Sequence, residues 1–123
     1  MIFGRSYDVT MTHRLIRQAR GIKKQYHRHK YTINIEIDGI VTDAGHIIAN
    51  DELDKIFTTR VTKVVDNKRL NEILGEGVEP TVENFVIWVW GRIATRILDS
   101  VKPKATLKRV LIYQGSFYGE HIA

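Results

Sequence analysis

The strongest constraint on the fold is a long alternating run at residues 26–38. Its odd-numbered side chains share one side of an extended chain, and the mostly polar even-numbered ones share the other. This period of two predicts a β-strand with one buried face. Along that face, His27 and His29 come first, Tyr31 follows, and isoleucines occupy positions 33, 35 and 37. Both imidazoles therefore project from the same side of one strand.

Three further segments are expected to be strands. Residues 5–11 alternate, and His13 lies just beyond them on the side of Val9 and Met11. Residues 106–113 alternate in the same way, and a short apolar strand is expected at residues 46–49, after turn-forming Asp and Gly residues. The basic segment between the first two strands has no clear period and is expected to be a loop.

Two segments have helical spacing. The first begins near Asn50, which can act as a cap and is followed by two acids that suit the positive end of a helix dipole. The second follows Pro80, with Thr81 as its cap, and has apolar residues at 82, 85, 86, 89, 93 and 97. It is expected to end near Val101, before Pro103.

The regions between these helices are less regular. Residues 61–65 are ambiguous, because their β-branched side chains favour strands. Residues 66–77 are expected to form a loop that ends in Gly75 and Gly77.

The resulting order, β-β-β-α-α-β, predicts one α+β domain spanning residues 1–123. Two helices would cover one face of a four-stranded antiparallel sheet. Such a sheet has two open edges, and pairing these edges between identical subunits would close it. The sequence therefore favours a homo-oligomer.

Composition limits the function classes. The chain has no cysteine, so it has no disulfide, thiolate ligand or cysteine nucleophile. No apolar run approaches the roughly 20 residues of a membrane helix, and the N-terminus lacks signal-peptide features, so a cytoplasmic protein without membrane contact is expected. Much of the net charge of +5 lies between residues 14 and 30, where there is no acid. That segment is either a solvated loop or a docking surface for phosphate.

A metal site is the first chemical hypothesis. Neutral imidazole is the commonest protein ligand for zinc, and three protein ligands with one open position are the catalytic arrangement. His27 and His29 share a strand face, and His13 ends the preceding strand. Whether His13 joins the pair cannot be decided from spacing, and all three could instead be structural histidines.

Five short segments occur in an order typical of one enzyme family. They are Met-Thr-His-Arg-Leu at 11–15, Tyr-His-Arg-His-Lys-Tyr at 26–31, the glycine-led segment 45–50, Asp-Asn-Lys-Arg-Leu-Asn at 66–71 and Pro-Thr-Val-Glu-Asn at 80–84. With these segments the chain resembles the 6-pyruvoyl-tetrahydropterin synthase and 6-carboxy-tetrahydropterin synthase family, the second being the queuosine-pathway enzyme. The resemblance covers nearly the whole chain.

The resemblance implies a tunnelling fold (T-fold) whose subunits associate as trimers stacked into hexamers. It also implies Zn²⁺ held by His13, His27 and His29. The implied function is that of a lyase acting on 7,8-dihydroneopterin triphosphate or a related dihydropterin. Zinc would polarise the oxygens of the substrate side chain.

The chain departs from the family pattern around that site. Lys23 stands where the family has a cysteine, Asn67 where it has a histidine, and Gln114 where it has a glutamate that anchors the pterin ring. Ala49 replaces an aspartate before the first helix. Of the usual proton-moving set only Asp66 remains.

Each candidate residue also has an ordinary structural explanation. Asp66 and Lys23 are the candidate catalytic residues, but Asp66 could cap a loop and Lys23 could be a solvated side chain. Gln114, Thr81 and Glu83 are the candidate substrate-binding residues, although the last two also serve a helix start.

His46 is a further candidate that could replace the lost proton carrier, or it could be an ordinary surface histidine.

Four functions remain open on the sequence. The first is a zinc-dependent pterin lyase with altered proton chemistry. The second is a catalytically inactive homologue that binds a pterin- or purine-like ligand, and the third is a subunit that needs a second chain to supply missing groups. Nucleic-acid binding ranks last, because no nucleic-acid-binding motif accompanies the basic segment.

Overall fold

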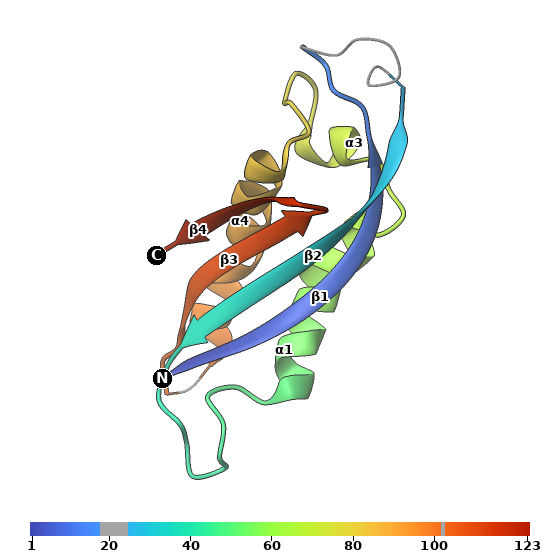
Figure 1. The fold of residues 1–123 in the computed structure, drawn as a ribbon. Coiled ribbons are helices and arrows are strands. Elements are labelled where there is room, and N and C mark those ends of the chain that lie inside the picture. Colours follow the sequence, from blue (N-terminus) through green and yellow to red (C-terminus); the bar gives the residue numbers. More distant parts are fainter. Residues whose placement is uncertain (18–24, 102) are drawn as a thin grey trace.

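The computed structural model describes residues 1–17, 25–101 and 103–123. It shows a four-stranded antiparallel sheet with the helices packed on one face, which confirms the expected α+β class (Figure 1). The strands follow one another across the sheet in chain order: β1 (Ile2–His13), β2 (His27–Asp38), β3 (Thr106–Gln114) and β4 (Phe117–Ile122).

The fourth strand is not the one expected from the sequence. Residues 46–49 form no strand, and Ile47 and Ile48 are both buried, which an alternating strand with one buried face does not allow. The fourth strand is instead β4, joined to β3 by a tight turn in which Gly115 has a φ of 61°. Its glycine, Gly119, and its exposed polar residues hid the strand pattern.

The helical layer contains more pieces than expected. Its elements are α1 (Asn50–Phe57), the π-helical turn η2 (Thr58–Thr62), α2 (Lys63–Val65), α3 (Leu70–Leu74) and α4 (Val82–Ser100). The ambiguous residues 61–65 are therefore helical, and the expected loop at 66–77 contains α3. Val61, Val65 and Leu70 are fully buried, although Val64 is exposed, and burial in this layer outweighs the β propensity of the two buried valines.

The two expected helix caps differ in outcome. Thr81 caps α4 as expected, since its hydroxyl accepts a hydrogen bond from the Asn84 backbone N–H at 3.2 Å. Asn50 does not cap α1, because it is the first helical residue and Ala49 occupies the cap position. The long helix ends at Ser100, with Val101 as its C-cap.

The core lies between the sheet and the helices. Tyr31 and the isoleucines at 33, 35 and 37 of β2 are fully or almost fully buried, as their alternation predicted. They pack with the buried stripe of α4, and the Tyr31 and Phe85 rings meet edge to face at a centroid distance of 5.5 Å. None of the described helices is long and apolar enough to cross a membrane.

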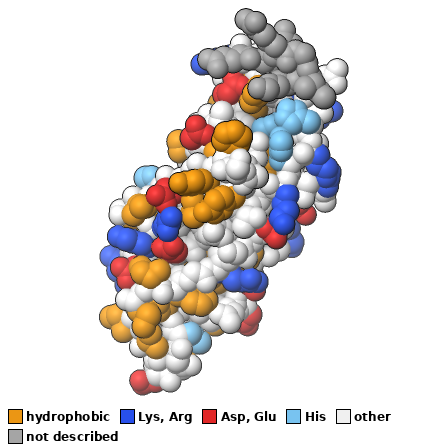
Figure 2. All heavy atoms as spheres, viewed as in Figure 1, with side chains coloured by type: hydrophobic (Ala, Val, Ile, Leu, Met, Phe, Trp, Pro, Cys, Tyr) orange, Lys and Arg blue, Asp and Glu red, His pale blue; other side chains and the backbone are white. Residues whose placement is uncertain are grey.

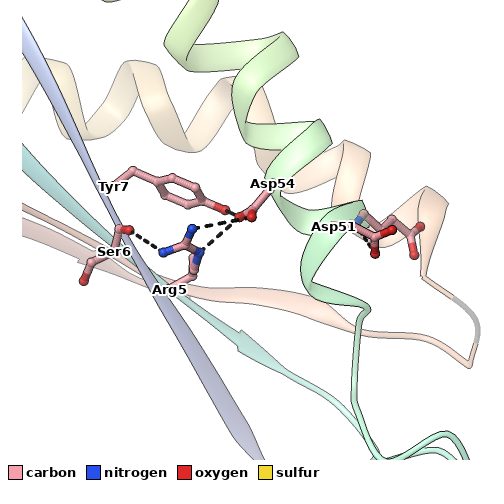
Figure 3. Close-up of polar contacts among 6 residues, drawn as sticks. Arg5, Ser6, Tyr7, Asp51 and Asp54 are labelled. Atoms are coloured by element: carbon pink, nitrogen blue, oxygen red, sulfur yellow. Dashed lines mark hydrogen bonds and ion pairs between the residues drawn. The ribbon is translucent and has the colours of Figure 1, made fainter.

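A polar clamp fastens the edge strand β1 to α1 (Figure 3). Tyr7 Oη donates a hydrogen bond to Asp54 Oδ1 at 2.7 Å, and Arg5 Nε donates to the same oxygen at 3.0 Å. The hydrogen bond from Arg5 holds the pKa of Asp54 below its usual value. The Tyr7 ring stacks on Phe57 at a centroid distance of 3.8 Å, so the clamp combines polar and apolar contacts.

Candidate metal centre

Three histidines meet at one end of β1 and β2. His13 is paired directly with His27, and His29 is paired with Met11, so the register places the three imidazoles side by side on the helix-facing side of the sheet. One nitrogen from each ring lies within 4.8 Å of the others. His13 is only 3% exposed, and the other two are half-buried. The sheet register thus brings His13 to the pair, which spacing alone could not establish.

Hydrogen bonds fix which nitrogen of two rings is available. His13 Nδ1 lies 3.0 Å from the Pro80 carbonyl oxygen, and His27 Nδ1 lies 2.9 Å from the Gln25 carbonyl oxygen. A carbonyl oxygen only accepts, so both Nδ1 atoms carry the proton and donate it. In neutral imidazoles both Nε2 atoms are then bare acceptors. Carbonyl partners of this kind are typical of the outer shell around metal-bound histidines.

The two bare nitrogens lie closer than neutral acceptors prefer. His13 Nε2 and His27 Nε2 are 3.0 Å apart, with no proton to share between them if both rings are neutral. Two nitrogens bound tetrahedrally to zinc at about 2.0–2.1 Å would be roughly 3.3 Å apart. A cation between the rings would turn this contact into two favourable bonds, so the residues fit a metal with nitrogen ligands.

Burial prepares these rings for a metal. Burial lowers the pKa of His13 to about 4, and burial also lowers the pKa of His29 below its ordinary value. Both rings are therefore neutral at pH 7, which is the form that binds metal ions.

The loop before α4 forms one wall beside the histidines. Pro80 provides the carbonyl bound to His13, and the Glu79 carboxylate accepts hydrogen bonds from the backbone N–H groups of Ile16 and Arg17 at 2.6 and 3.1 Å. A cavity of about 320 Å³ is lined here by Leu15, Arg17, Glu79 and Thr81. Glu79 has no distinguishing pattern in the sequence and was not among the expected site residues, although it immediately precedes the Pro-Thr segment.

Of the three candidate binding residues, Thr81 belongs to this wall and Gln114 lies on the sheet face of the histidines. Gln114 is paired with Tyr31 and therefore shares the sheet face of the histidines. Tyr31 Oη lies 3.3 Å from His13 Nδ1. Glu83 is exposed in the first turn of α4. Thr81 lines the cavity, so the structure places Thr81 and Gln114 on the same side of the sheet as the imidazoles.

The structure places Asp66 and Asn67 elsewhere, at the outer edge of β1. Asp66 Oδ1 accepts a hydrogen bond from the Thr10 backbone N–H at 2.9 Å, and the Asn67 N–H donates to the Thr10 carbonyl at 2.7 Å. Asn67 has a φ of 60°, which asparagine tolerates better than most residues. Asp66 does not belong to the cluster of three histidines. Lys23 lies outside the described residues.

His46 lies at the opposite end of the sheet. It lines a groove of about 520 Å³ together with Met1 and Ile2. Ile2 is the first residue of β1, whereas His13 is the last. At about 3.3 Å per residue, the strand separates its two ends by more than 30 Å. His46 therefore cannot replace a proton carrier at the histidines of the same subunit.

The surroundings of the histidines are basic. Figure 2 shows a patch of histidine side chains, in pale blue, at the surface near the upper end of the molecule, with Lys and Arg side chains nearby. The exposed arginines at this end of the sheet are Arg14, Arg28 and Arg69.

Comparisons with known proteins agree with this architecture. Residues 5–117 match the sequence profile of the family described as 6-pyruvoyl tetrahydropterin synthase. A dihydroneopterin monophosphate aldolase from Pyrococcus furiosus is 27% identical over 96 residues, covering 78% of this chain and 76% of the relative.

Two solved structures share the fold. The 6-pyruvoyl tetrahydropterin synthase of Caenorhabditis elegans superposes with a TM-score of 0.76 at 18% identity, covering 100% of this chain and 95% of its own. An uncharacterized protein from Wolinella succinogenes, WS1659, gives a TM-score of 0.67 at 13% identity, covering 99% and 97%. The first match confirms the expected tunnelling fold.

Proposed function

The chain belongs to the 6-pyruvoyl tetrahydropterin synthase family of pterin-processing enzymes, and on this premise we propose that it is a zinc-dependent lyase acting on a phosphorylated dihydropterin. The proposed substrate is 7,8-dihydroneopterin triphosphate or a close relative. The observation that carries the proposal is the pair of bare Nε2 atoms 3.0 Å apart, held by two carbonyl partners.

The histidines would hold the metal. His13, His27 and His29 supply three nitrogen ligands and leave one position for a substrate oxygen. Zinc bound there would act as a Lewis acid on the hydroxyl and carbonyl oxygens of the substrate side chain. The Pro80 and Gln25 carbonyls orient two of the rings, and burial keeps His13 neutral.

Three residues are proposed to bind the ligand. Gln114 offers one donor and one acceptor to the edge of a heterocycle. The Thr81 hydroxyl accepts from the helix N–H, so its own proton is available to a ligand oxygen. Glu83, the second residue of α4, is the third proposed binding residue.

Proton transfer is proposed for Asp66 and Lys23. Asp66 uses Oδ1 to hold Thr10, and its second carboxylate oxygen can take a proton. Because Asp66 lies at the outer edge of β1, it would serve the site of a neighbouring subunit. Lys23 is assigned from its place in the sequence alone.

Oligomer formation is part of this proposal. Within the described residues, β4 pairs only with β3, and β1 pairs with β2 along its length and is bridged to Arg69 at Thr12. The remaining strand edges are free to pair with identical subunits. We propose trimers stacked into hexamers in the cytoplasm, and mass measurement of the intact assembly tests this order.

The Pyrococcus relative suggests which lyase reaction to test. It is named as an aldolase for dihydroneopterin monophosphate, and an aldolase breaks a carbon–carbon bond of its substrate. A synthase reaction on the triphosphate is the other outcome within the same class. Both require a proton to be removed from a side-chain hydroxyl or its neighbouring carbon.

A second function is favoured by Asn67 and Gln114. Asn67 cannot transfer a proton at neutral pH, and its side-chain oxygen accepts a hydrogen bond from Arg28 at 2.7 Å. Gln114 is neutral where the family pattern has a glutamate. A homologue that binds a pterin- or purine-like ligand without converting it would retain the fold and the metal.

One experiment separates these functions. The zinc-loaded protein is incubated with the monophosphate and the triphosphate of 7,8-dihydroneopterin, and products are identified by mass spectrometry. A shortened side chain indicates the aldolase reaction, and a 6-pyruvoyl or 6-carboxy product indicates a synthase. His29→Ala should abolish either product. Ligand binding without any product would establish the second function and reject the enzyme.

A further inference from the structure

A second cluster of functional side chains surrounds Tyr26. Tyr26 immediately precedes β2, and Arg14 immediately follows β1. Thr12 is paired with Arg28 on one side and bridged to Arg69 on the other, so the register brings both arginines to the same end of the sheet. We call this group the arginine cluster: Arg14, Arg28, Arg69 and Tyr26.

Two of the guanidinium groups pack on the Tyr26 ring. The central carbon of Arg69 lies 4.1 Å from the ring centroid, and that of Arg14 lies 5.4 Å from it. Stacking on an aromatic face orients a guanidinium while leaving its N–H donors free at the edges. Arg28 is oriented separately by its 2.7 Å hydrogen bond to the neutral Asn67 side chain.

Acidic groups compensate this charge only weakly. The ion pair of Arg69 with Glu72 spans 3.6 Å, and both of its side chains are more than half exposed. In residues 1–17, 25–101 and 103–123, no carboxylate forms an ion pair with Arg14 or Arg28. Two guanidinium groups therefore lie over the Tyr26 ring and a third, that of Arg28, lies at the same end of the sheet. Among the described residues, the ion pair of these arginines is the exposed one with Glu72.

The cluster lies apart from the metal centre. Arg28 alternates with His27 and His29 along β2, so its side chain projects from the opposite face of the sheet. Further along that face the charges are already matched, because Lys30 lies beside Asp8 and Arg109 is bound to Glu36. Among the described cations of β2, Lys30 has an ion-pair partner and Arg28, at the end of the strand, has none.

We propose that the arginine cluster is a binding site for the phosphate groups of a small phosphorylated molecule, separate from the three histidines. Guanidinium forks match phosphate oxygens in bidentate geometry, and stacking on Tyr26 reduces the entropy lost on binding. A group of three arginines fits one or two phosphate groups, whereas a nucleic-acid strand is bound along an extended basic track. This site does not depend on the proposed reaction.

Calorimetric titration of the full chain with inorganic pyrophosphate tests the proposal. Pyrophosphate is expected to bind, with equal affinity for zinc-loaded and chelated protein. Arg69→Gln and Arg14→Gln should each weaken binding about tenfold or more, which is the loss expected for a charge-assisted hydrogen bond. Tyr26→Leu should also weaken binding, whereas Tyr26→Phe should not.

The matched control is Arg96→Gln, which removes an exposed arginine from α4 and should leave the affinity unchanged. Circular dichroism checks that each variant folds. Loss of binding on zinc removal would overturn the proposal, because the anion would then lie on the metal. Unchanged affinity in both Arg14→Gln and Arg69→Gln, or tighter binding of a single-stranded oligonucleotide than of pyrophosphate, would also overturn it.

Discussion

Zinc should stabilise this protein through His13. A ligand at about 100 times its dissociation constant adds about 2.7 kcal/mol to the unfolding free energy. For a chain of 123 residues, an unfolding entropy of about 2.1 cal/mol/K per residue gives a slope of about 0.26 kcal/mol per degree. The melting temperature of chelated protein should therefore rise by about 10 °C when zinc is restored.

His13→Ala should remove most of this zinc-dependent rise. The variant keeps two histidine ligands, and it also loses the hydrogen bond to Pro80, so it starts from a lower melting temperature. Differential scanning calorimetry with and without zinc separates these effects, since only the difference reports the metal. His46→Ala, at the far end of the sheet, is the matched control and should keep the full rise. A full rise in His13→Ala would refute the assignment of His13 as a ligand.

Three other perturbations follow from the structure. Thr81→Ala should lower the unfolding free energy by about 1 kcal/mol, whereas Thr81→Ser, which keeps the capping hydroxyl, should not. Urea titration measures both values, and equal losses in the two variants would argue against capping. Because the pKa of His13 falls from 6.5 in the unfolded chain to about 4 on folding, the metal-free protein should lose stability as the pH falls from about 6.5 towards 4. Urea titrations across this range should show a smaller loss in His13→Ala, and identical losses would contradict the burial argument. Asp54→Asn should lower the unfolding free energy by less than about 1 kcal/mol, because the ion pair of Asp54 with Arg5 is partly exposed. A double-mutant cycle with Arg5→Gln measures the coupling between the two side chains. A coupling of several kcal/mol would contradict a surface ion pair.

Much of the fold could be predicted from local patterns. Alternation identified three of the four strands and the shared face of His27 and His29, because a strand allows only two side-chain directions. The apolar stripe and the Thr81 cap identified α4.

The errors arose where local pattern and tertiary contact disagree. Ile47 and Ile48 form an apolar pair that suggests a strand, but they belong to an irregular segment in which both side chains are buried. Strand β4 has little apolar pattern, and it is defined by its pairing with β3 rather than by its own residues. Val61 and Val65 prefer strands in isolation and are helical because the core buries them.

The site was only partly accessible from the sequence. The direct pairing of His13 with His27 depends on the register between β1 and β2, which no local pattern encodes. The carbonyl partners of the rings and the role of Glu79 come from backbone groups, whose positions depend on the whole fold. The edge position of Asp66 likewise follows from its long-range bond to Thr10.

The most direct test of the metal centre is zinc stoichiometry combined with X-ray absorption at the zinc edge. We expect one zinc per subunit, with three nitrogen ligands at about 2.0–2.1 Å and one further position taken by an exchangeable oxygen. Absence of zinc after reconstitution, or a zinc shell without three imidazole nitrogens, would contradict the assignment of His13, His27 and His29.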